Sequence, residues 1–137
     1  MAYPPINLTL SSGDSEVQWL TIPGIPKPKE RPRIGRHGNV YTPKDTTNYE
    51  NTVKKWAIKR KIKKIEGHIA GMITFYLPDR RVRDLDNIVK GVMDALQKIA
   101  WDNDANIGWI ENKKGGLLIR KALDKENPRA ELVFWKA

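Results

Sequence analysis

The stretch HIAGMITFYLPDRRVRDLDNIVKGVMDALQKIA, residues 68–100, contains the signals that decide the fold. Residues 68–77 are strongly apolar, which predicts a strand, and residues 78–83 form a basic turn. From Ile88 to Ala100 the apolar residues recur at helical spacing, which predicts an amphipathic helix. A strand, a turn and a helix in this order indicate a domain in which a sheet and helices pack together.

Apolar segments on either side of this stretch predict further strands. A small hairpin is expected over residues 34–41, on the two sides of Gly38. The other strands are expected at 17–22, 106–110, 117–122 and 130–135.

A second amphipathic segment predicts a helix upstream of the apolar strand. Thr42 can cap this helix, Pro43 suits its first position, and Gly67 would end it. Two sets of apolar residues lie on nearly opposite faces, namely Tyr49, Val53, Trp56 and Ala57 on one and Ile58, Ile62 and Ile65 on the other. The helix is therefore either covered on two sides or shorter than the segment.

The length of 137 residues predicts one small domain with a modest core. The fold class expected is α/β of the α+β type, with a mixed β-sheet and two main helices. Residues 1–16 are expected to be a flexible N-terminal tail, and residues 17–137 the domain itself.

The composition excludes several classes of site. The chain has no cysteine and two histidines, which removes disulfide frameworks, cysteine-bound zinc, iron–sulfur clusters and thiol nucleophiles. No apolar run is long enough to span a bilayer, and the N-terminus does not have the pattern of a signal peptide. We expect a cytoplasmic protein without membrane contact.

The positive charge is concentrated in one part of the chain. The chain has 25 Lys and Arg against 16 Asp and Glu, a net charge of +9. Residues 23–65 carry thirteen bases and three acids, whereas residues 78–104 carry five bases and six aspartates. A basic surface favours polyanions through counterion release. An acidic cluster inside such a protein favours a bound divalent cation.

Asp84 and Asp86 are the first candidate ligands of that cation. They are two residues apart at the junction between the basic turn and the second helix, so in extended chain their side chains point the same way. Paired carboxylates repel unless a cation neutralises them, and Mg²⁺ and Mn²⁺ prefer such oxygen ligands. The alternative is that Asp86 or Asn87 only caps the helix and that Lys90 is a salt-bridge partner of Asp86.

A second acidic cluster, WDNDAN at residues 101–106, follows that helix. An EF-hand is rejected, because Ile107 and Lys113 stand where its glycine and final glutamate belong. A polar turn and a third metal carboxylate remain as interpretations. A helix of about 13 residues is about 20 Å long. Meeting Asp84 therefore requires a chain that folds back, a short helix or a second subunit.

Together these motifs resemble the RusA family of Holliday junction resolvases. The resemblance is carried by R-x-R-D-L-D-N-x-x-K-x-x-x-D-A-L at residues 81–96, followed by W-D-N-D-A-N-I at 101–107, with P-K-x-R-P-R and Y-T-P upstream. It implies a RusA-like endonuclease domain over residues 17–137, a homodimer, dependence on Mg²⁺ or Mn²⁺, and paired nicks in a four-way DNA junction. A bacterial, phage or prophage source is implied as well.

The resemblance also implies roles for individual residues. Asp84, Asp86 and Asp104 correspond to the catalytic metal carboxylates, and Lys90 to the lysine of the catalytic site. The chain departs from the family pattern at Asn103 and at Asn106, which replace an aspartate and a glutamine. Asp102 is therefore an alternative to Asp104.

The cations around this segment are candidates for binding the DNA backbone. The basic residues of the proline-rich stretch PGIPKPKERPR, residues 23–33, and of the basic turn are Lys27, Lys29, Arg31, Arg33, Arg80, Arg81 and Arg83. Their clustering predicts binding driven by charge and shape rather than by base reading. The competing functions are a metal-dependent nuclease for other branched or linear DNA, a DNA-binding protein without catalysis, and an RNA-binding protein.

Overall fold

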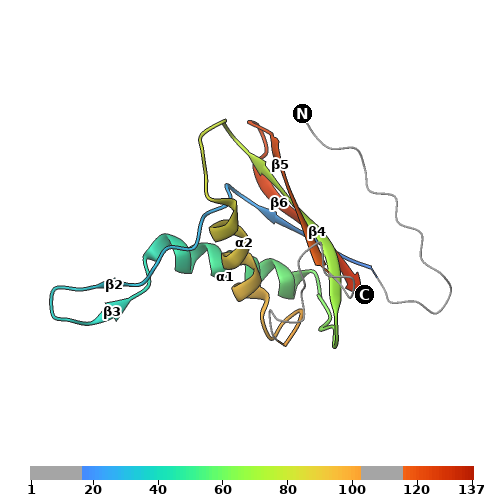
Figure 1. Ribbon diagram of the computed structural model, residues 1–137, viewed down its shortest axis with the longest axis horizontal. Coiled ribbons are helices and arrows are strands. Elements are labelled where there is room, and N and C mark those ends of the chain that lie inside the picture. The colour runs from blue at the N-terminus through green and yellow to red at the C-terminus, as the bar shows by residue number, and fades with distance from the viewer. Residues whose placement is uncertain (1–16, 103–115) are drawn as a thin grey trace.

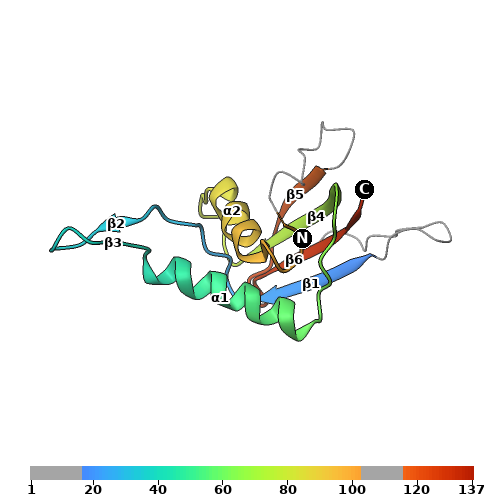
Figure 2. The ribbon, with the colours of Figure 1, turned by 90° about the horizontal axis from the view of Figure 1, so that it is seen from below.

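The computed structural model describes residues 17–102 and 116–137. Within them, two helices pack on one face of a four-stranded sheet, and a hairpin projects from the body (Figures 1 and 2). The α+β class, with a mixed sheet and two main helices, is thereby confirmed. The elements are β1 Gln18–Pro23, β2 Arg33–Ile34, β3 Val40–Tyr41, α1 Lys44–Lys59, β4 Ile69–Leu77, α2 Leu85–Leu96, β5 Gly116–Leu123 and β6 Arg129–Lys136.

The sheet has the strand order β1-β6-β4-β5. β6 is antiparallel to both β1 and β4, whereas β4 and β5 are parallel. A parallel pair requires a crossover connection, and α2 lies within the one that joins β4 to β5. The turn after β4 leads directly into α2, so the N-terminal end of that helix follows the carboxyl end of β4.

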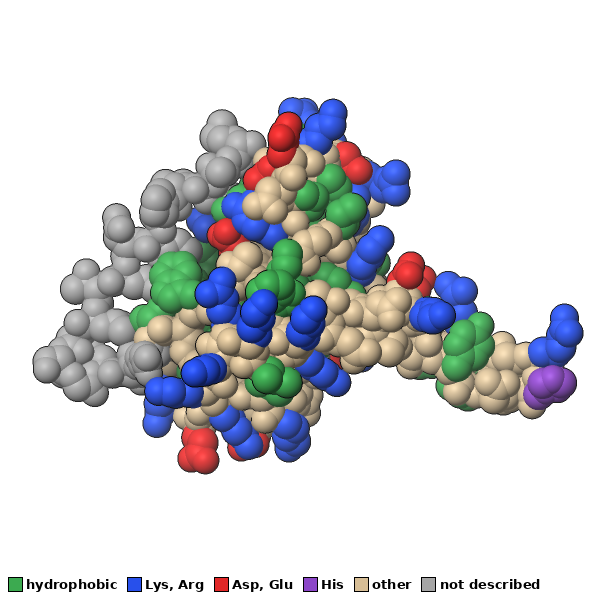
Figure 3. Space-filling view, turned by 180° about the vertical axis from the view of Figure 1, so that it is seen from behind, with side chains coloured by type: hydrophobic (Ala, Val, Ile, Leu, Met, Phe, Trp, Pro, Cys, Tyr) green, Lys and Arg blue, Asp and Glu red, His purple; other side chains and the backbone are tan. Residues whose placement is uncertain are grey.

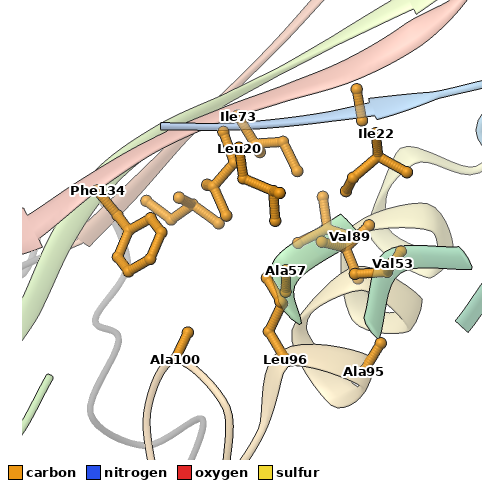
Figure 4. Packing of buried hydrophobic residues seen from close by; sticks show 14 of the residues in the cluster. Leu20, Ile22, Val53, Ala57, Ile73, Val89, Ala95, Leu96, Ala100 and Phe134 are labelled. Atoms are coloured by element: carbon orange, nitrogen blue, oxygen red, sulfur yellow. The ribbon is translucent and has the colours of Figure 1, made fainter. Parts of the chain in front are cut away.

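The core lies between the sheet and the two helices (Figure 4). Ile73 of β4, Val53 of α1 and Val92 of α2 are all fully buried in it. Trp101 is 1% exposed and packs edge-on against Phe134, with 5.7 Å between the ring centroids. The apolar stripe predicted for the second helix therefore faces the core as expected.

The second helix begins and ends earlier than the predicted range Ile88–Ala100. Asp84 is its N-cap, so its first turn includes the Leu85–Asn87 segment. The helix ends at Leu96, because the next two residues leave the helical conformation. Gln97 has extended backbone angles, and Lys98 has a left-handed φ of 74°. The chain then turns back, and Gln97 forms an isolated bridge with Trp101.

The first helix is also shorter than its apolar segment. It ends at Lys59, well before Gly67, and Lys61 has a left-handed φ of 56°. Ile62 and Ile65 pack against the core from the chain beyond the helix, so only one helical face needs cover. The prediction that Thr42 caps the helix was wrong, because Pro43 is the N-cap and makes no side-chain capping bond.

Two expectations fall outside the described residues, namely the tail over 1–16 and the strand over 106–110. In the described part, neither helix is long and apolar enough to cross a membrane.

Candidate active site

A cleft of about 770 Å³ lies between the proline-rich segment and the N-terminal half of α2. It is therefore a place where residues distant in sequence meet. α2 contributes its cap and two residues of its first turns, and the proline-rich segment contributes the facing wall. The lining residues are Pro28, Lys29, Glu30, Arg31, Pro32, Arg33, Asp84, Asn87 and Lys90.

Asp84 is fixed by its role as the cap of α2. Its Oδ1 accepts a hydrogen bond of 3.2 Å from the backbone N–H of Asn87, and its Oδ2 accepts one of 2.9 Å from the Asn87 side-chain amide. The helix is capped by Asp84 rather than by Asp86 or Asn87. An ionised carboxylate has about four lone-pair sites, so these two bonds leave acceptor capacity on both oxygens. Capping and binding a cation are therefore compatible.

Asn87 is a site residue that sequence reasoning assigned only to capping. It lines the cleft and bonds both carboxylate oxygens of Asp84. The signal for this role was its position three residues after the cap, where a backbone N–H reaches back to the cap side chain.

Asp86 and Lys90 follow on the first two turns of α2, and both are exposed. Lys90 lines the cleft with Asp84. Asp86 stands in the first helical turn, where a negative charge is favoured by the helix dipole, but it is not among the lining residues of the cleft.

Lys29 joins the proline-rich segment to both helices. Its backbone N–H donates to the carbonyl oxygen of Asn87 at 3.0 Å, and its ammonium group pairs with Asp94 of α2 and, at 3.5 Å, with Glu50 of α1. The hydrogen bond to Asp94 is the main cause that raises the pKa of Lys29 above its ordinary value. Lys29 is therefore held by carboxylates of its own chain, in addition to its predicted part in binding DNA.

Glu30 also attaches the proline-rich segment to the helices. The backbone N–H of Glu30 donates to the hydroxyl oxygen of Thr46 at 3.0 Å, and Thr46 is buried. The wall of the cleft is thus fixed at two consecutive residues, one to α2 and one to α1.

The three arginines of the basic turn are not equivalent. The Arg83 guanidinium makes two hydrogen bonds to Asp79, at 2.7 and 3.3 Å, and the Arg83 side chain is 13% exposed. These bonds are the main cause that lowers the pKa of Asp79. Arg80 and Arg81 are exposed. Arg83 therefore braces the turn that leads to Asp84, while Arg80 and Arg81 face solvent.

The second acidic cluster begins at the other end of α2. Asp102 forms an ion pair with Lys64, which lowers the pKa of Asp102. The helix has 12 residues and is thus about 18 Å long, with Asp84 before its start and Asp102 after its end. Asp104 lies outside the described residues. Within residues 17–102 and 116–137, no group of three or more His, Cys, Asp or Glu side chains forms a metal site.

Cations are also numerous on the face of the protein that lies behind α2 in the view of Figure 1. On the face seen in Figure 3, Lys and Arg side chains cover much of the body and continue along the projecting hairpin. Lys27, Arg31 and Arg33 of the proline-rich segment are exposed, and Arg33 also pairs with Glu30 at 3.2 Å.

The sequence of the chain is similar to known proteins along most of its length. The family model described as "Endodeoxyribonuclease RusA" matches residues 23–133, which include the cleft, both helices and the hairpin. A crossover junction endodeoxyribonuclease RusA of Aquifex aeolicus (strain VF5) is 31% identical over 111 residues, which cover 74% of this chain and 87% of that protein.

Proposed function

The chain belongs to the RusA family of endodeoxyribonucleases, and from this we propose that it resolves four-way DNA junctions by metal-dependent hydrolysis of two phosphodiester bonds. The observation that carries the proposal is the cleft, in which Asp84 and Lys90 of α2 face the basic proline-rich wall. The expected place of action is the bacterial cytoplasm, with a chromosome, prophage or phage as the source of the gene.

The carboxylates at the start of α2 are of the donor type that a hard divalent cation prefers. Asp84 and Asp86 offer carboxylate oxygens, both residues are exposed, and Asp84 keeps its orientation through Asn87. RusA-family nucleases depend on a divalent metal, and such oxygen ligands suit Mg²⁺ or Mn²⁺. When bound, this ion would activate a water molecule and stabilise charge on the phosphate oxygens.

In this proposal, the other residues in and around the cleft either contact the DNA or hold the cleft in shape. Lys90 would hold the scissile phosphate and stabilise the negative charge that develops on it. Arg31 and Arg33, on the opposite wall, would contact the backbone of the same strand. Lys27, Arg80 and Arg81 would extend this contact along the DNA, whereas Lys29 and Arg83 would hold the wall and the turn in place.

We further propose that Asp104 supplies the third carboxylate from the second subunit of a homodimer. The support is the position of Asp102, two residues earlier, after the far end of the 12-residue helix that Asp84 caps. A dimer with two-fold symmetry also presents two equivalent sites, as paired cleavage of a junction requires.

Cleavage of defined DNA substrates tests this function. The wild type and Asp84→Asn should be compared on a four-way junction, a flap and a linear duplex, with and without Mg²⁺ or Mn²⁺. We expect paired junction cuts only from the wild type with metal, and undiminished junction binding by the variant. Glu66→Gln, which removes an exposed carboxylate from the segment between α1 and β4, is the matched control.

Two outcomes would contradict the proposal. Equal cleavage of all three substrates would indicate a nuclease without junction specificity. Cleavage that survives in Asp84→Asn would remove this carboxylate from the catalytic site.

A further inference from the structure

The hairpin of β2 and β3 exposes an apolar pair that the catalytic proposal does not use. It projects from the body of the protein, away from the sheet (Figures 1 and 2). Ile34 and Val40 are register partners on its two strands, so their side chains lie next to each other. Their exposed fractions are 77% and 70%. The two β-branched side chains thus form a small apolar patch in solvent.

The tip that follows this pair has a defined shape. The Gly35 N–H donates to the Asn39 carbonyl at 2.7 Å, and the Gly38 N–H donates to the Gly35 carbonyl at 3.1 Å. Gly38 has a φ of 81°, which a residue with a side chain rarely adopts. The two strands are thereby held in register, and the apolar pair keeps a fixed position at the base of this tip.

The charge around the pair identifies the kind of partner. Arg31, Arg33, Arg36 and Lys44 are the charged residues of segment 31–44 at neutral pH, and this segment contains no acid. Arg33 pairs with Tyr41 in register, next to the Ile34–Val40 pair, and also lines the catalytic cleft. The hairpin is therefore a basic element that continues the cleft wall.

A nucleic acid fits this combination better than a second copy of the chain. Two side chains are far too little for a stable protein interface, which buries about 800 Å² on each partner. Two such basic ribbons would also repel each other. By contrast, single apolar side chains on basic elements are sufficient to enter a base step and unstack it.

We propose that Ile34 and Val40 form a wedge that enters the branch point of the DNA and unstacks the base pairs there. This inference rests on the proposed function and adds the element that distinguishes a branched from a linear substrate. The cleft supplies backbone contacts that any duplex offers, whereas the wedge gains contacts only where stacking is already interrupted.

The test uses the double variant Ile34→Ser/Val40→Ser and a junction with 2-aminopurine beside the branch point. We expect the wild type to raise the fluorescence on binding without metal, and the variant to raise it little. The ratio of junction affinity to duplex affinity should fall about tenfold in the variant. Ile58→Ser, at an isoleucine of α1 that is 68% exposed, should change neither quantity.

Circular dichroism and sedimentation of the same variant complete the test. Both altered side chains are exposed, so we expect an unchanged fold and an unchanged oligomeric state. A variant that sediments as a smaller species would instead assign the pair to contact between copies, and unchanged fluorescence and selectivity would also overturn the wedge. If the wild type opens the branch point but cuts no junction, the proposed function fails while the wedge stands.

Discussion

Lys29 of the proline-rich segment pairs with Asp94 on the third turn of α2, although 65 residues separate them in the sequence. This pair, together with the bond from the Lys29 N–H to the Asn87 carbonyl, sets the spacing of the cleft walls. On one side of the cleft are the carboxylate and lysine of α2, and on the other are Arg31 and Arg33. Under the proposed function, the width available to a DNA strand would therefore depend on a contact outside the proposed catalytic residues.

Replacing Lys29 should widen the cleft and weaken substrate binding. We expect Lys29→Met to lower the free energy of unfolding by about 1 kcal/mol, because Asp94 and Glu50 lose their common partner. The KM for junction DNA should rise more than kcat falls, and a cycle with Asp94→Asn should show coupling between the two residues. Lys27→Met removes a neighbouring exposed lysine and should leave stability unchanged. Equal effects of both lysine variants on stability would contradict the attachment.

Two substitutions of Asp84 should separate its two roles. Asparagine is as good an N-cap as aspartate, so Asp84→Asn should abolish cleavage with little loss of stability. Asp84→Ala should abolish cleavage and also lower the free energy of unfolding by about 1 kcal/mol. Urea unfolding and junction cleavage measure the two effects. If Asp84→Ala is as stable as Asp84→Asn, the capping bonds contribute nothing to the fold.

Mixed dimers should reveal whether a site is shared between subunits. An equal mixture of Asp84→Asn and Asp104→Asn chains would form heterodimers in which one shared site is intact. About a quarter of wild-type nicking should then return, as single rather than paired cuts. A mixture of Asp84→Asn and Asp86→Asn should stay inactive, because each site would still lack one carboxylate. Failure of the first mixture in chains that do exchange would place all three aspartates in one subunit.

The pKa of Asp79 should report on the basic turn. The bonds from Arg83 lower this pKa from its ordinary value of 3.8, so their contribution to stability is complete above that pH and is lost as the pH falls through the lower folded value. We expect Arg83→Met to raise the pKa of Asp79 toward its ordinary value, measured by NMR titration. Lys125→Met is the control in a different turn. An Asp79 pKa that does not respond to Arg83→Met would exclude this pair as the brace of the turn.

Much of the fold could be predicted from local patterns. The apolar run of β4 reflects a strand that is largely buried on both faces, and the stripe of Ile88, Val92 and Leu96 reflects a helix that is buried on one face. The helix ends were predicted less well. They depend on single backbone conformations, such as the left-handed φ of Lys61 and Lys98, which non-glycine residues rarely adopt and sequence does not mark.

The residues of the candidate site also differ in how far the sequence could predict them. Asp84 and Lys90 could be selected because both lie close in sequence to Asp86, Asp84 two residues before it and Lys90 four residues after it. The facing wall could not be placed, because the pairing of Lys29 with Asp94 and of Glu30 with Thr46 depends on how distant segments pack. The role of Asp104 remains a prediction, and Asp102 forms an ion pair with Lys64.

The capping bonds of Asp84 have a consequence for the order of assembly. Since the formation of α2 itself orients this carboxylate, the proposed first metal ligand would be in place before any ion binds. Under the proposed function, the enzyme would therefore bind its substrate without cleaving it and become active only when an ion binds. Chelation of the ion should leave the protein bound to DNA without cleavage. All complexes should then begin to cleave at the same time when the ion is added back.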